Sequence, residues 1–166
     1  FAKGMEPIRL TRERGKQLTQ PVTAAEKSAL RGLLGALQWP SSQTAAFLAA
    51  SVSLLQGQVN CATVETIKEA NSLLRFYQAN ADVGLSYSPV CALHEIVFGT
   101  FSDAAWAVRK SGSSQGGLLT WASSPGVLQG KPSELMTLDW SSRKIERVSR
   151  SSLSSETQQA AIGVDH

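Results

Sequence analysis

The residues EIVFGTFSDAAWAVRKSGSSQGGLLTWAS, 95–123, decide the fold of the second half of the chain. Two segments within them, 95–101 and 116–123, are rich in β-branched and aromatic side chains, as β-strands are. A loop rich in serine and glycine joins the two. Segments 83–88 and 134–140 have the same β-like composition. We therefore predict three or four strands in this half of the chain.

Three amphipathic helices are predicted before these strands. The first begins with a capping box, in which Thr23 is the N-cap and Glu26 the third helical residue, and it is expected to end at Pro40. The others are expected over about 42–56 and 62–80. The side chains expected in the core recur at helical spacing, and they are Leu30, Leu33, Leu34, Leu37, Phe47, Leu48, Val52, Leu55, Val64, Ile67, Ala70 and Leu74.

A last helix is expected from about Ser152, after the strands. The order of helices, strands and helix predicts an α+β chain with a boundary near 81–94. Of the 166 residues, 42% are hydrophobic and 17% are charged, which is enough apolar surface for a core and too little charge for a disordered chain.

The net charge of +3 lies at the N-terminus, where residues 1–16 hold five Lys and Arg against two Glu. Residues 1–22 are therefore interpreted as a basic arm, either a solvated linker or a segment that binds nucleic-acid phosphate.

Cys61 and Cys91 are too few for a disulfide framework, and no secretory signal is recognisable, so we expect an intracellular setting, cytoplasmic or nuclear. The longest apolar-rich stretch, 44–55, is shorter than the ~20 residues that span a bilayer, so no membrane segment is expected.

Two carboxylates stand out by position. Asp103 ends the first strand segment and, by alternation, shares a face with Val97 and Phe101. Glu156 lies between Leu153 and Ala160 on the last helix, where the spacing predicts the face that packs against the sheet. An acid on a core-facing surface needs a cation, a hydrogen-bond network or a raised pKa, and two such acids in one small domain indicate a shared Mg²⁺. The alternative is that Asp103 is a turn or cap residue, and that Glu156 lies near the start of a helix because the helix dipole favours a negative charge there.

The order of three motifs resembles the start of the ribonuclease H domain of copia-type retrotransposon Pol polyproteins. These motifs are SDAAWA (102–107), SSQGGLLTW (113–121) and LDWSSRKIERVSRSSLSSETQQA (138–160). Residues 23–88 are similar to the reverse transcriptase thumb and connection region that precedes that domain. Residues 95–166 correspond to its N-terminal part, and the chain is expected to be a piece of a longer polypeptide.

This resemblance implies a partial ribonuclease H-like mixed β-sheet with a packed helix, with Asp103 on the central strand. It implies that Asp103 and Glu156 are catalytic ligands of Mg²⁺, with Mn²⁺ as an alternative, in an endonuclease that cleaves the RNA strand of RNA–DNA hybrids. The implied partners are that hybrid and the rest of the Pol polyprotein. The family's third and fourth carboxylates are missing, and Gln158 replaces a further acid, so the chain alone is expected to be inactive. The competing interpretation is a degenerate, non-catalytic remnant that binds nucleic acid or a protein.

Four basic residues precede the last helix and form a candidate strip for phosphate, namely Arg143, Lys144, Arg147 and Arg150. Glu146 interrupts this strip.

Asp139 is expected to be a surface acid that shares one face of its strand with Leu135 and Thr137. The four tryptophans could stack on bases, but core packing is the preferred interpretation because three lie in or beside strands, and they are Trp39, Trp106, Trp121 and Trp140.

Overall fold

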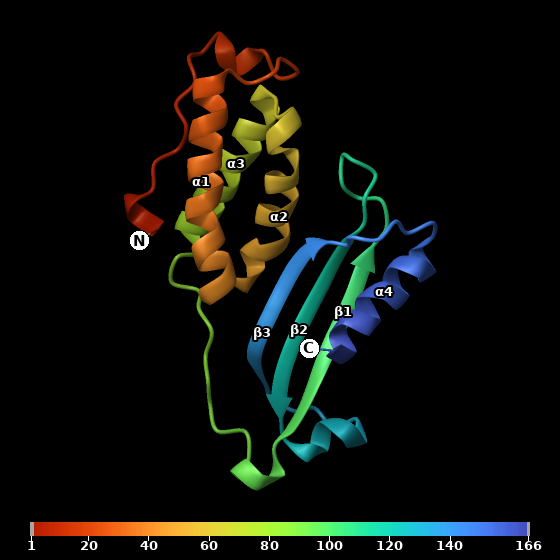
Figure 1. The fold of residues 1–166 in the computed structure, drawn as a ribbon. Helices are drawn as coiled ribbons and strands as arrows, with labels where there is room; N and C mark the ends of the chain where they lie inside the picture. Colours follow the sequence, from red (N-terminus) through yellow and green to blue (C-terminus); the bar gives the residue numbers. More distant parts are fainter. Residues whose placement is uncertain (1, 166) are drawn as a thin grey trace. The chain divides into compact units, whose positions relative to one another are not determined.

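The computed structural model describes residues 2–165 and is an α+β chain of two compact units, divided between Gly84 and Leu85 (Figure 1). The division falls inside the stretch 81–94, where the sequence changes from helical to strand periodicity. Each unit is described by itself. Within the described part of the chain, none of the helices combines the length and apolar character that crossing a bilayer requires.

The first unit is a bundle of three helices, α1 (Ala24–Gln43), α2 (Ala49–Gln58) and α3 (Val64–Ala79). Short 3₁₀ turns at Ala46–Leu48 and Val59–Cys61 flank α2. Every side chain predicted for the core is buried except Phe47. That ring is 39% exposed and meets the exposed ring of Phe76 edge to face, with centroids 5.7 Å apart. The helical periodicity therefore predicted most of this core, but it missed five further buried residues, namely Ala2, Ala45, Val59, Ala62 and Tyr77.

The prediction that α1 ends at Pro40 is wrong. The helix continues for three residues, and the proline ring is fully buried. A proline removes a hydrogen bond only to the preceding turn, so the residues after it can remain helical. Here the backbone N–H groups of Thr44 and Ala45 both donate to the Pro40 carbonyl, at 3.0 and 2.8 Å.

The N-terminal arm packs against the bundle. Asn71 on α3 exchanges two hydrogen bonds of 2.8 Å with the backbone of Ile8, and Gln78 donates to the carbonyl oxygens of Ala2 and Met5. The described residues up to Gly84 form one compact unit. Side chains of α3 therefore hold the backbone of the arm at these points, while most of the arm's own residues are exposed.

The capping box of α1 is formed and is joined to the arm by an ion pair. The Thr23 N–H donates to Glu26 Oε2 at 2.7 Å, and the Glu26 N–H donates to Thr23 Oγ1 at 3.2 Å. Arg14 donates to both carboxylate oxygens of Glu26, at 2.9 and 2.8 Å. These hydrogen bonds from Arg14, with smaller contributions from Thr23, lower the pKa of Glu26 from its ordinary 4.5 to about 2.

The second unit holds a three-stranded antiparallel sheet of order β1 (Val97–Ala105), β2 (Gln115–Ser123) and β3 (Leu135–Lys144), followed by α4 (Ser152–Asp165). The mixed sheet with a central first strand is not seen in the described residues, because β1 lies at an edge and short loops join consecutive strands antiparallel. The expected strand over 83–88 is also absent. Strand propensity acts through packing against neighbouring strands, and this segment pairs with none.

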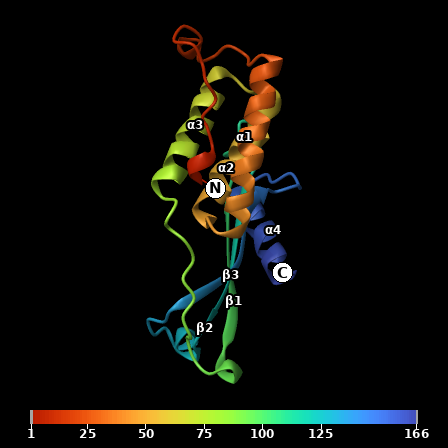
Figure 2. The ribbon, with the colours of Figure 1, turned by 90° about the vertical axis from the view of Figure 1, so that its left-hand side faces the viewer.

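Helix α4 covers one face of the sheet, over β1 and β2, as Figure 2 shows with the sheet nearly edge-on. A Cβ atom added to Gly163 of α4 would lie 3.2–3.5 Å from Leu118, Ser102 and Thr100, so these side chains define the α4 face. On the opposite face the rings of Phe101 and Trp121 lie 5.4 Å apart. Strand alternation gives these two faces different chemistry.

A register shift in β3 changes the face of Asp139. Thr120 pairs with Asp139 and the next residue, Trp121, pairs with Thr137, so Leu138 is an extra residue in the strand. An extra residue reverses the alternation beyond it. Asp139 and Thr137 therefore lie on opposite faces, and the expectation that they share one is wrong.

We expect Glu26→Gln to lower the thermal stability of the chain at pH 7, since the lowered pKa of Glu26 means that the folded state stabilises the ionised carboxylate. This stabilisation is complete above the ordinary pKa of 4.5 and disappears as the pH falls towards 2. The difference in Tm between Glu26→Gln and the wild type, measured by circular dichroism, should shrink over that range. The exposed Glu13 forms no salt bridge in the described chain, and Glu13→Gln should leave the Tm at pH 7 close to that of the wild type.

Candidate functional site

Asp103 lies in β1 on the face turned away from α4. It pairs with Gly117 and alternates with Phe101, as the sequence predicted, whereas its neighbours Ser102 and Ala104 lie on the α4 face. The side chain is exposed, and its Oδ1 accepts a hydrogen bond of 2.8 Å from the Ala104 N–H. The expectation that this carboxylate is buried is therefore wrong.

The sheet-facing side of α4 is polar and small. Ser155 and Gln159 are 0% and 1% exposed, and each has a partner on β2 or the loop before it. Ser155 Oγ donates to Ser114 Oγ at 3.0 Å, and Gln159 Nε2 donates to the Gly117 carbonyl at 3.1 Å. Gly116 makes room for Gln159, because a Cβ atom there would overlap the glutamine amide. The packing of α4 against the sheet therefore depends on these hydrogen bonds and on the close approach that Gly116 allows.

The predicted sheet-facing stripe of α4 is wrong. Leu153 and Val164 are 71% and 86% exposed, and Glu156 between them is exposed as well. The spacing of hydrophobic residues did not predict the buried side of α4, because the surface that this helix contacts presents small and polar groups, such as Gly116 and Ser114, that fit polar side chains.

The structure does not bring Asp103 and Glu156 together. One carboxylate lies on the open face of the sheet, and the other is exposed on the helix that covers the opposite face. Among residues 2–165 there is no cluster of three or more His, Cys, Asp or Glu side chains placed to hold a metal ion. A shared Mg²⁺ ion needs oxygens within about 2.1 Å of one point, so this arrangement does not fit it.

Three residues of the predicted basic strip line a cavity of ≈570 Å³ between the end of β3 and α4. These are Arg143, Lys144 and Arg147, whereas Arg150 lies outside it. The buried side chain of Ile145, the acid Glu146 and the helix residues complete the lining, and the helix residues are Thr157, Gln158, Ala161 and Ile162. No salt bridge neutralises any of the four basic residues within the described chain, so their charges are available to an anion.

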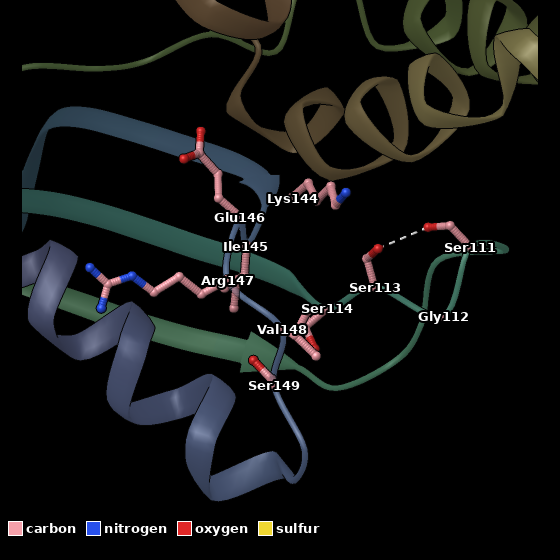
Figure 3. Close-up of a pocket in the computed structure, with 10 residues that line it drawn as sticks. All are labelled: Ser111, Gly112, Ser113, Ser114, Lys144, Ile145, Glu146, Arg147, Val148 and Ser149. Carbon is pink, nitrogen blue, oxygen red and sulfur yellow. Dashed lines mark hydrogen bonds between the residues drawn. The ribbon is translucent and has the colours of Figure 1, made fainter.

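A second cavity of ≈210 Å³ lies beside the first, between the serine-rich loop 111–114 and residues 144–149 (Figure 3). The hydroxyls of Ser111 and Ser113 lie 3.0 Å apart and hydrogen-bond to each other. Arg147 lines both cavities, and Figure 3 shows its side chain extending away from the serine loop towards α4. The guanidinium group of Arg147 is therefore directed towards the larger cavity beside α4 and away from the serine hydroxyls.

Ser114 joins the elements around these cavities, a role that the sequence did not reveal. Its Oγ accepts hydrogen bonds from the Ala107 N–H and from Ser155, and its carbonyl accepts from the Ile145 N–H at 3.0 Å. The loop after β1, the end of β3 and the start of α4 therefore meet at one buried serine.

The tryptophans differ in exposure. Trp121 is 7% exposed, in agreement with the preferred core interpretation, but Trp106 is 49% exposed. The Trp106 indole N–H donates to the carbonyl of Ser149, within the basic segment, at 3.2 Å.

Comparisons with protein-family models, with curated proteins and with solved structures gave no match for this chain. The fold and the site by themselves define an α+β protein whose second unit carries a cationic groove beside its last helix.

Gly116→Ala and Gly117→Ala test the two faces of the sheet with adjacent residues. The first places a methyl group in the space of the Gln159 amide, and overpacking of this kind costs about 1–3 kcal/mol. The second places it on the open face, where the nearest atom, the Asp103 carbonyl oxygen, would be 3.9 Å away. We expect urea denaturation to show a loss of stability for Gly116→Ala only, and an equal loss in both variants would contradict this position of α4.

We expect Asp103→Asn and Glu156→Gln to have independent effects on Mg²⁺ binding, because the two carboxylates lie on opposite sides of the sheet. Isothermal titration calorimetry of the wild type, both single variants and the double variant measures this directly. A saturable site that either single substitution abolishes would show that the two groups share one ion.

Proposed function

We propose that the chain is a segment of a copia-type retroelement polyprotein, and that its second unit binds the phosphate backbone of a nucleic acid. The observation that carries the binding proposal is the groove beside α4, which is lined by Arg143, Lys144 and Arg147 together with one acid, Glu146. None of the three basic residues forms a salt bridge within the described chain. Unpaired guanidinium and ammonium groups on a groove are the usual means of holding phosphates.

The retroelement origin rests on the motifs and on the order of the elements. SDAAWA lies in and just after β1, and RSSLSSE leads into α4. The order of three strands followed by a helix agrees with the resemblance, although the sheet is antiparallel and β1 lies at its edge. The helical bundle that precedes it agrees with the thumb and connection region that the resemblance implies.

Binding is favoured over hydrolysis by this chain. The hydrolytic proposal needs Asp103 and Glu156 at one metal ion, and they lie on opposite sides of the sheet. Cleavage of RNA–DNA hybrids is proposed only for a parent polyprotein that supplies further carboxylates. For the chain itself, incubation of a labelled hybrid with Mg²⁺ should leave the RNA strand intact, and cleavage that Asp103→Asn abolishes would favour the enzyme instead.

The groove should bind without reading sequence. Its charged groups are side chains suited to phosphate oxygens, and such contacts position a nucleic acid but carry no base information. Glu146 also lines the groove, and its negative charge opposes the three cations there. Moderate affinity with a strong dependence on salt is therefore the expected behaviour.

We expect Arg143→Gln/Arg147→Gln to weaken binding of a fluorescent RNA–DNA hybrid and to reduce the slope of log K against log salt by about 2, since each lost phosphate contact removes about 0.9. Fluorescence anisotropy at several salt concentrations measures both quantities. The double variant Arg31→Gln/Lys131→Gln removes the same charge from exposed positions that line neither cavity. Equal effects of the two double variants would show that net charge, and not the groove, governs binding.

A further inference from the structure

Trp106 presents a fixed and half-exposed indole next to the basic segment 143–150. It directly follows β1 and is 49% exposed, although a tryptophan beside a strand is more often packed in the core. Its N–H group is satisfied by the Ser149 carbonyl at 3.2 Å. The ring is therefore anchored by its polar edge, while about half of its surface remains in contact with solvent.

The backbone after the ring is also fixed. Ala107 has a φ of 54°, the only positive φ of a non-glycine residue in the described chain, in a region that residues with a Cβ rarely adopt. Its N–H donates to Ser114 Oγ at 3.3 Å, and Ser114 is buried and bonded in turn to Ser155 of α4. The position of the indole is consequently set by hydrogen bonds on both sides of the turn.

Two arginines lie close in sequence to Ser149, whose carbonyl accepts the hydrogen bond from the Trp106 indole. Arg150 follows Ser149 directly and Arg147 precedes it by two residues, and both are exposed without a salt bridge in the described part of the chain. An exposed aromatic ring beside unpaired cations is the combination that binds single strands, where bases stack on the ring and phosphates contact the cations. In a duplex the faces of the bases are already covered by their neighbours.

We infer that Trp106 stacks on an unpaired base of a single-stranded nucleic acid whose phosphates lie along Arg147 and Arg150. This inference rests on the proposed function, because it uses the same basic segment, and it adds the class of ligand. Trp121 shows the contrast with a core tryptophan, since its ring packs against Phe101 on the sheet and is 7% exposed.

Two oligonucleotides of equal charge separate stacking from phosphate binding. A dT12 strand carries bases, and a 12-mer of abasic sites carries the same phosphates without them. Fluorescence anisotropy with the full chain should show that the wild type binds dT12 more tightly than the abasic strand. Trp106→Ala should reduce the affinity for dT12 about 5- to 100-fold, as loss of one stacked base does, and leave the abasic strand unchanged.

Two further variants control for structural damage. Trp106→Phe keeps a ring but loses the hydrogen bond to Ser149, and its affinity for dT12 should fall between those of the wild type and Trp106→Ala. Trp39→Ala removes a tryptophan of the first unit that is 57% exposed, and it should bind dT12 as the wild type does. Circular dichroism verifies the fold of each variant, and if Trp106→Ala does not fold, the wild type and Trp106→Phe still decide the question.

The possible results distinguish the two proposals. If the wild type binds dT12 and the abasic strand equally, or if Trp106→Ala weakens both equally, stacking on Trp106 is excluded while backbone binding by the groove stands. If the wild type binds neither strand nor the RNA–DNA hybrid, the proposed function itself fails. Tighter binding of dT12 that depends on Trp106, with abasic binding that depends on Arg147, supports both.

Discussion

The side chain of Gln159 occupies the space that a side chain at position 116 would fill, and this contact fixes α4 on the sheet. The amide bonds to the Gly117 carbonyl, and one turn earlier Ser155 bonds to Ser114. Because the helix lies on this face, the other face of β1 stays open and carries Asp103. Asp103 therefore lies on the face of the sheet turned away from the helix that carries Glu156.

The same packing creates the cationic groove. With α4 held over β1 and β2, the end of β3 is left uncovered beside the helix, and Arg143 and Arg147 line the space between. The two units use charge in opposite ways. Arg14 is satisfied by the carboxylate of Glu26 and stabilises the start of α1, whereas the guanidinium groups of the groove have no such partner in the described residues. The arginine that stabilises the first unit is therefore a different one from those of the proposed binding groove.

Local patterns in the sequence predicted the elements well. The capping box at Thr23, the leucine spacing of the first helix and the alternation around Asp103 all agree with the structure. Predictions that needed knowledge of a neighbouring element failed. The segment 83–88 has strand-like residues but no strand to pair with, and Leu138 reverses the alternation that Asp139 was expected to follow.

The sequence by itself determined the order of helices and strands, the core of the bundle and the identity of the basic strip, because these depend on spacing within one element. Only the tertiary structure decided which side of α4 meets the sheet. Hydrophobicity favoured Leu153 and Val164, but the sheet offers small residues and hydrogen-bonding groups, which accept Ser155 and Gln159 instead. Which face of a helix is buried depends on the shape and polarity of the opposing surface, and no pattern within the helix contains that information.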